Sequence, residues 1–189
     1  MKSNLKLLAY FFAAMLLISN SPIPFSEAEN EDSDVQLLCL NIGKADCMLL
    51  FAEDKTYLID SGYEHTWPAL QTALEEFSVT RLDGVFLTHT HVDHEGGLEK
   101  LAQSSMEIAA WYASDIFHDV KPSKHPMVKA AQIRDEEVTW LHAGDVIPIS
   151  DTASFTVLGP LSKNQDNENN NSLVLHLETQ EGNILFTAI

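Results

Sequence analysis

A cluster of metal-binding residue types occupies residues 88–97, which read Thr-His-Thr-His-Val-Asp-His-Glu-Gly-Gly. His89 and His91 are two positions apart at the end of an apolar stretch, and side chains two apart on an extended chain point the same way. Both imidazoles can therefore reach one metal ion. Asp93 and His94 follow at the expected turn into a helix, where they can face the same cavity and hold a second ion. These ligand types predict a site for a divalent metal such as zinc.

The alternative interpretation of this cluster is a solvated, histidine-rich loop. Against it stand the alternation of the histidines, the adjacent carboxylate and the preceding apolar strand. The following Gly96 and Gly97 also allow the backbone to approach closely. The other histidines have no such surroundings and are expected at the surface or in the core: His65, His118, His125, His142 and His176.

The elements that position the cluster are indicated by short apolar runs. Runs at 36–42, 47–52 and 55–60, separated by short polar turns, predict an antiparallel meander. A buried strand at 83–89 leads directly into the histidines. Further strands are expected at 108–113, 138–142, 146–149 and 154–158, with a final hairpin of 173–178 and 184–189.

Helices are predicted between these strands. Apolar residues at helical spacing indicate a helix over 66–77, with Thr66 as its cap. Another helix is expected to start near His94 and a third over 126–136, whereas residues 162–171 form a polar loop. This mixture predicts a layered α/β domain with helices outside two sheets.

The amino-terminal residues differ from the rest of the chain. Residues 1–28 have a short basic start, twelve nearly continuous apolar residues and a small-residue end, the layout of a secretory signal peptide. A membrane anchor is the alternative, but this run is short for about 30 Å of hydrocarbon. Residues 29–34 are an acidic leader, and 35–189 form one domain. We expect a secreted or extracytoplasmic protein without a stable membrane span after cleavage.

Net charge and cysteine content restrict the function further. The formal charge of −17 would become −18 on loss of the signal peptide, which removes two lysines and one glutamate. Such acidity disfavours a nucleic-acid partner, which normally requires clustered Lys and Arg. Cys39 and Cys47 lie in apolar runs and are expected to be buried free thiols. A disulfide between them is the alternative in an oxidising compartment.

Several segments resemble, in order, the metallo-β-lactamase superfamily, and within it the hydrolase domain of ComEC-type competence proteins and their free-standing secreted relatives. The most specific is His-x-His-x-Asp-His at 89–94. The others are Leu40–Cys47 (first-strand motif), Leu58–Gly62 (L-I-D-x-G), Ala143–Asp145 (a turn), Asn169–Leu175 (N-N-S-L-V-L) and Leu185–Thr187 (L-F-T).

The resemblance implies a four-layer αββα sandwich with a metal site at one edge between the sheets. His89 and His91 would bind a first ion, and Asp93 and His94 a second. Asp93 would also be catalytic by orienting the attacking water. Zinc is the expected cofactor, as one or two ions, with manganese or iron as alternatives. A bound metal lowers the pKa of water toward about 7 and so supplies a nucleophile.

The sequence also departs from the family pattern. It ends at Ile189, before the aspartate that usually follows L-F-T-G and before a His-His-Gly-Ser motif, so the resemblance implies a domain truncated at its C-terminus. In the first-strand motif, Asn41 stands for an aspartate and Ala45 for a glycine. Asp46 is kept and is expected to fix a turn by hydrogen bonds.

Three functions follow from these observations. The resemblance favours a phosphodiesterase-like metallohydrolase that acts on a small molecule or a phosphodiester. A lactam or other acyl hydrolase is the second, although the segment before Ser172 is asparagine-rich where many family members carry Gly-His-Thr. The third is an inactive truncated domain or binding module.

Overall fold

The computed structural model describes residues 35–117, 124–164 and 167–187. The expected signal peptide, the acidic leader and His118 lie outside the described residues. Among the residues that the structure describes, no helix is both long and apolar enough to cross a membrane.

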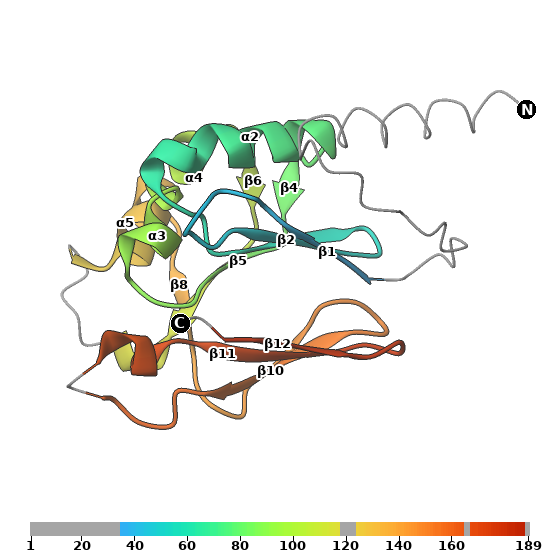
Figure 1. Cartoon of the computed structure of the whole chain (residues 1–189), viewed down its shortest axis with the longest axis vertical. Coiled ribbons are helices and arrows are strands. Elements are labelled where there is room, and N and C mark those ends of the chain that lie inside the picture. Colours follow the sequence, from blue (N-terminus) through green and yellow to red (C-terminus); the bar gives the residue numbers. More distant parts are fainter. Residues whose placement is uncertain (1–34, 118–123, 165–166, 188–189) are drawn as a thin grey trace, which may run out of the picture. The chain divides into compact units, whose positions relative to one another are not determined.

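The first sheet has six strands in the order β1-β2-β3-β5-β7-β8 (Figure 1). Strands β1 to β3 pair antiparallel, which confirms the predicted meander, and β3, β5, β7 and β8 run parallel. Because parallel strands end at the same edge, the residues that follow β3 and β5 lie close together. The bounds are Val35–Cys39, Met48–Ala52, Lys55–Ile59, Gly84–Leu87, Trp111–Ser114 and Val138–Leu141.

Helices cover one face of this sheet. The buried side of α2 (Trp67–Glu76), α4 (Leu98–Gln103) and α5 (Pro126–Ile133) joins Leu49, Leu58 and Trp111 in one core cluster. The predicted helices are present, although α5 ends at Ile133. Thr66 is the N-cap residue of α2, as expected, but its side chain forms no capping hydrogen bond, because its hydroxyl donates to the carbonyl oxygen of Tyr63 at 2.9 Å. Tyr63 lies just before a short 3₁₀ helix, η1 (Glu64–Thr66).

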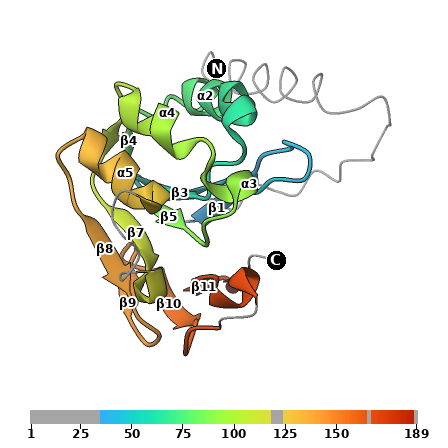
Figure 2. The same cartoon turned by 90° about the vertical axis from the view of Figure 1, so that its left-hand side faces the viewer.

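A second sheet packs against the opposite face of the first (Figures 1 and 2). Its order is β12-β11-β10-β9, all antiparallel, and the core between the sheets includes Phe86, Phe155 and Leu175. The described residues thus form three layers of the expected αββα sandwich, namely one layer of helices and two sheets. The bounds are Val146–Pro148, Ser154–Gly159, Val174–Glu178 and Asn183–Phe186 for β9 to β12.

Smaller elements complete the fold. The apolar run at 108–113 is divided between β6 (Glu107–Ile108) and β7, and β6 pairs with β4 (Arg81–Leu82), a strand that the sequence pattern did not predict. A 3₁₀ turn, η2 (Asp115–Phe117), follows β7. The expected polar loop contains a 3₁₀ helix, η4 (Glu168–Asn171).

The two cysteines are both free, but only one is buried. Cys47 is buried, as expected, whereas Cys39 is exposed. β1 is an edge strand, and Cys39 is its last residue. The expectation of a buried thiol is therefore wrong for Cys39.

Candidate metal centre

Two parallel strands bring Asp60 and Thr88 to the same edge of the first sheet. Asp60 follows β3 and Thr88 follows β5, and Tyr57 to Ile59 of β3 pair with Gly84 to Phe86 of β5. The backbone of Asp60 has a φ of 56°. Aspartate tolerates this left-handed conformation better than most residues, and it ends the strand so that the carboxylate faces Thr88.

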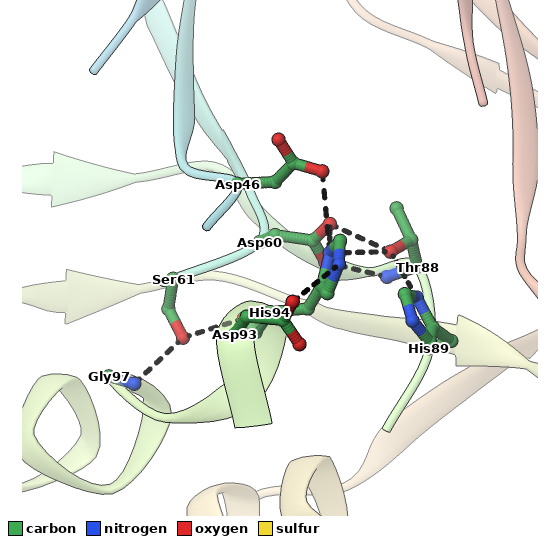
Figure 3. A network of polar contacts seen from close by, with 8 residues as sticks. All are labelled: Asp46, Asp60, Ser61, Thr88, His89, Asp93, His94 and Gly97. Atoms are coloured by element: carbon green, nitrogen blue, oxygen red, sulfur yellow. Dashed lines mark hydrogen bonds and ion pairs between the residues drawn. The ribbon is translucent and has the colours of Figure 1, made fainter. Parts of the chain in front are cut away.

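A buried hydrogen-bond network surrounds the Asp60 carboxylate (Figure 3). Its Oδ1 accepts from the backbone amide of Thr88 at 2.8 Å, and its Oδ2 accepts from the Thr88 hydroxyl at 2.7 Å. Oδ2 also lies 2.8 Å from Nδ1 of His94. Three contacts hold one buried carboxylate, which is the compensation that a buried charge requires.

This network orients His94. With Nδ1 donating to Asp60, the other ring nitrogen, Nε2, carries a free lone pair and lies 4.0 Å from Oδ2 of Asp93. Burial lowers the pKa of His94, but the hydrogen bond and charge of Asp60, with Asp46 and Asp93, outweigh it and raise that pKa above its usual value. A carboxylate that fixes the tautomer in this way is typical of metal-binding histidines.

His89 offers a second buried nitrogen. Its Nδ1 lies 3.2 Å from the Thr88 hydroxyl, whereas its buried Nε2 has no hydrogen-bond partner in the part of the chain that the structure describes. Burial, with the charges of His94 and His91, lowers the pKa of His89 to about 4 despite the opposing charges of Asp93 and Glu168. The imidazole is therefore neutral at pH 7, the state in which it binds a metal.

The other two predicted ligands lie at the open side of the same cluster. The His89 ring centroid is 4.1 Å from that of His94 and 4.5 Å from that of His91. His91 and Asp93 are partly exposed, whereas His89 and His94 are almost fully buried. The structure thus places the rings of His91 and His94 next to that of His89 and Asp93 beside His94, with His89 and His94 buried and the other two residues partly exposed.

The turn between α3 (Val92–Glu95) and α4 is held against the loop after β3. The Ser61 hydroxyl donates to the carbonyl oxygen of His94 at 3.0 Å and accepts from the amide of Gly97 at 3.1 Å. A Cβ on Gly97 would lie 2.5 Å from the Ser61 carbonyl oxygen, and one on Gly96 would lie 2.4 Å from the backbone nitrogen of Glu64. The expected close approach at these glycines is confirmed, and it sets the position of His94.

Asp46 contributes to the surroundings of His94. Its side chain lies 3.7 Å from Nδ1 of His94, so its carboxylate faces the site rather than the amides of its own turn, and the turn-fixing role expected of it is wrong. Asp46, Asp60 and His94 place one ligand atom each within 4.8 Å of one another. However, the 2.8 Å between Asp60 and His94 is a hydrogen-bond distance. We therefore assign Asp60 to orientation of His94.

Sequence reasoning missed the roles of Asp60, Ser61 and Thr88. All three are buried polar residues that lie next to apolar strands, and Asp60 and Ser61 belong to the L-I-D-x-G segment. The sequence shows that these polar residues directly follow buried strands. Because parallel strands end at the same edge of a sheet, such residues could have been expected to lie close together.

The donor set fits a divalent metal. Nε2 of His89 is buried and has no hydrogen-bond partner among the described residues. In His94, the hydrogen bond between Nδ1 and Asp60 fixes the ring, so that Nε2 lies beside the carboxylate of Asp93. Nitrogen and oxygen donors of this kind suit zinc and related first-row ions. No hydrogen bond to another residue would be lost at His89 Nε2 on metal binding.

Comparisons with known proteins agree with this fold. The sequence profile of the "Metallo-beta-lactamase superfamily" matches residues 40–188. ComE operon protein 3 of Bacillus subtilis (strain 168) is 27% identical over 78% of this chain and 21% of that protein. Anti-Pycsar protein Apyc1 of Paenibacillus sp. (strain J14) is 53% identical over 29% of this chain and 21% of its own length. The match therefore spans about a fifth of each curated relative.

Solved structures show the same architecture. Rm3 metallo-beta-lactamase superposes with a TM-score of 0.57 at 15% identity, over 80% of this chain and 58% of that one. Identity this low concerns the fold alone. It supports the layered arrangement of helices and sheets around the candidate metal centre.

Proposed function

Because the chain belongs to the metallo-β-lactamase superfamily, we propose that it is a metal-dependent hydrolase that cleaves phosphodiester bonds with a water nucleophile. The observation that carries the proposal is the pair of imidazoles at the candidate centre. His89 has a buried Nε2 without a hydrogen-bond partner, and His94 is oriented through Nδ1 by Asp60. A buried polar atom without a partner is costly unless a ligand uses it.

Each residue has a distinct role in this proposal. His89 and His91 would hold one ion, and Asp93 and His94 would hold another. Bound metal supplies Lewis-acid activation of water and of the scissile phosphoryl group. Asp93, which is partly exposed, accepts a hydrogen bond from the attacking water and orients it. Asp60 keeps His94 in the tautomer with a free Nε2.

Zinc is the proposed metal. Neutral imidazole nitrogens with carboxylate oxygens are the usual ligands of catalytic zinc. Manganese and iron accept the same donors, and affinity alone does not separate them, because availability and geometry decide occupancy. Metal analysis of the purified protein therefore accompanies any assay.

Phosphodiester cleavage is favoured over lactam hydrolysis by the curated relatives. The two that match are ComE operon protein 3 and an anti-Pycsar protein, and neither name describes a lactamase. The lactamases among the solved structures have low sequence identity to this chain, 15% for Rm3 metallo-beta-lactamase, so they support the fold and not the substrate. A net charge of −17 favours a small phosphodiester over a long polyanion.

The experiment is hydrolysis of bis(4-nitrophenyl) phosphate by the full chain after incubation with zinc, manganese or iron(II). We expect metal-dependent release of nitrophenol that is lost in His89→Ala. A chromogenic cephalosporin is assayed in parallel. Cleavage of the cephalosporin alone would replace the proposal by an acyl hydrolase, and inactivity on both substrates despite bound metal would favour a binding module.

We also propose that the protein is exported. The support is the signal-peptide layout of residues 1–28. Expression in a secreting bacterial host should release a product into the medium. The mass of this product should correspond to a chain that begins at Glu29. An uncleaved product that stays with the cells would contradict export.

A further inference from the structure

Glu168 lies at the open side of the metal centre, although it comes from a distant segment. It begins η4, in the loop between β10 and β11, and its Oε2 lies 3.4 Å from Nε2 of His91. The Thr90 hydroxyl donates to its other oxygen, Oε1. One carboxylate oxygen is thus held by Thr90, while the other faces Nε2 of His91.

The distance between His91 and Glu168 is informative. A charge-assisted hydrogen bond between nitrogen and carboxylate oxygen spans about 2.7–2.9 Å. Two ligand atoms that each lie about 2.0–2.1 Å from a tetrahedral zinc ion are about 3.3 Å apart. The observed 3.4 Å matches the separation of two ligands of one ion better than that of a hydrogen bond.

The asparagine-rich loop explains why Glu168 is placed there. Asn171 is buried, and its side-chain amide forms two hydrogen bonds with the backbone of Asn164, at 2.6 and 2.8 Å. The Asn167 side chain accepts from the amide of Asn169 at 3.0 Å and so begins η4. Because the amide of Asn171 is engaged by the loop itself, Glu168 is the side chain that the loop presents to His91.

The loop is also tied to the strand that carries the histidines. The amide of Leu173 donates to the carbonyl oxygen of Thr88 at 2.8 Å. This hydrogen bond holds the end of the loop beside the strand end that leads into His89 and His91, and Glu168 faces His91 from the loop.

We infer that Glu168 is a third protein ligand of the metal ion bound by His89 and His91, so that this ion has two nitrogen ligands and one carboxylate ligand. The inference rests on the proposed metal centre. It assigns a metal-binding role to the polar loop between β10 and β11, and it would leave one position of a four-coordinate ion open for water or substrate.

The test is metal binding by the full chain and three variants: Glu168→Gln, His89→Ala and Glu181→Gln. Glu181 is exposed in the β11–β12 turn, so Glu181→Gln makes the same change of charge away from the site. Zinc affinity is measured by competition with a chromophoric chelator. Cobalt(II) is then bound in place of zinc, and its visible absorption reports the ligands directly. Circular dichroism checks that each variant is folded.

We expect Glu168→Gln to weaken zinc binding at least about tenfold and to change the cobalt absorption spectrum, while Glu181→Gln changes neither. A cobalt spectrum in Glu168→Gln identical to that of the unchanged chain would overturn the inference and leave the proposed function standing, provided that His89→Ala abolishes binding. Failure of the unchanged chain to bind zinc or cobalt would overturn both.

Discussion

Replacing the Asp60 carboxylate by an amide changes a hydrogen-bond acceptor without changing the size of the side chain. In Asp60→Asn, His94 loses the anionic partner of its Nδ1, and the tautomer with a free Nε2 is no longer favoured. We expect zinc affinity to fall about 10- to 100-fold, measured by competition titration. Asp54→Asn, an exposed change of the same kind, should leave affinity unaltered. Equal affinity in both variants would show that Asp60 does not orient a ligand.

The two thiols should differ strongly in reactivity. Burial, with the charges of Asp60 and Asp46, raises the pKa of Cys47, and the thiolate is the reactive form. Cys39 is exposed on β1. Labelling of the native chain with a thiol reagent at pH 8 should modify one cysteine per molecule, and Cys39→Ser should abolish this fast reaction. Rapid modification of Cys47 in the native state would contradict the burial described.

Asp60 and Glu168 also show why part of the site could not be predicted. The histidines and Asp93 form a contiguous motif, so spacing alone predicted a cluster, and the structure brings those four side chains together. Asp60 is 34 residues from His94, and Glu168 is 77 residues from His91. Their roles depend on which strands are neighbours and on how one loop turns back, and neither is encoded in local periodicity.

At the scale of elements, the turn between α3 and α4 packs so closely against the loop after β3 that it leaves no room for a side chain at Gly97. Gly97→Ala would place a Cβ 2.5 Å from the backbone oxygen of Ser61, so α4 must shift. We expect a loss of about 1–3 kcal/mol in the free energy of unfolding, measured by urea denaturation. Gly182→Ala is the control because nothing lies within 4 Å of its added Cβ. Equal stability of the two variants would mean that this turn is not tightly packed.

The strands and helices themselves were largely predictable, for reasons that differ between elements. Strands β1 to β3 and the β11–β12 hairpin have apolar runs bounded by polar turns, so their positions and antiparallel pairing were predicted. β4 has only two residues, too few for any periodic pattern, and is present because it pairs with β6. The exposure of Cys39 follows from the place of β1 at a sheet edge, which only the strand order reveals.

At the scale of the whole molecule, His125 makes stability depend on pH. It is buried between Phe117 and Trp140, and neither ring nitrogen has a hydrogen-bond partner among the described residues. Burial lowers the pKa of His125 to about 4, compared with 6.5 for an ordinary histidine. Between these two values the unfolded chain binds a proton that the folded chain does not, so stability must fall as pH drops from about 6.5 to 4.

This dependence gives a measurable difference. When the pH falls from 7 to 5, His125 should lower the free energy of unfolding by about 1–2 kcal/mol. In His125→Met, most of this decrease should be absent. His89 acts in the same direction, so the variant reduces the acid sensitivity without abolishing it. Replacement of the exposed His65 by Gln serves as control. Parallel pH profiles for His125→Met and the unchanged chain would rule out a buried neutral His125.

The hydrogen bond from the Leu173 amide to the Thr88 carbonyl oxygen joins the two sheets beside the metal centre. Leu173 is fully buried, so solvent reaches this amide only when the sheets separate locally. Deuterium uptake at Leu173 therefore measures how often the interior opens at this point. In the proposed centre, His89 and His91 after β5 and Glu168 in the loop before Leu173 would bind the same ion. Bound metal should therefore slow deuterium uptake at Leu173. The effect should be smaller at the amides of β9, at the far edge of the second sheet.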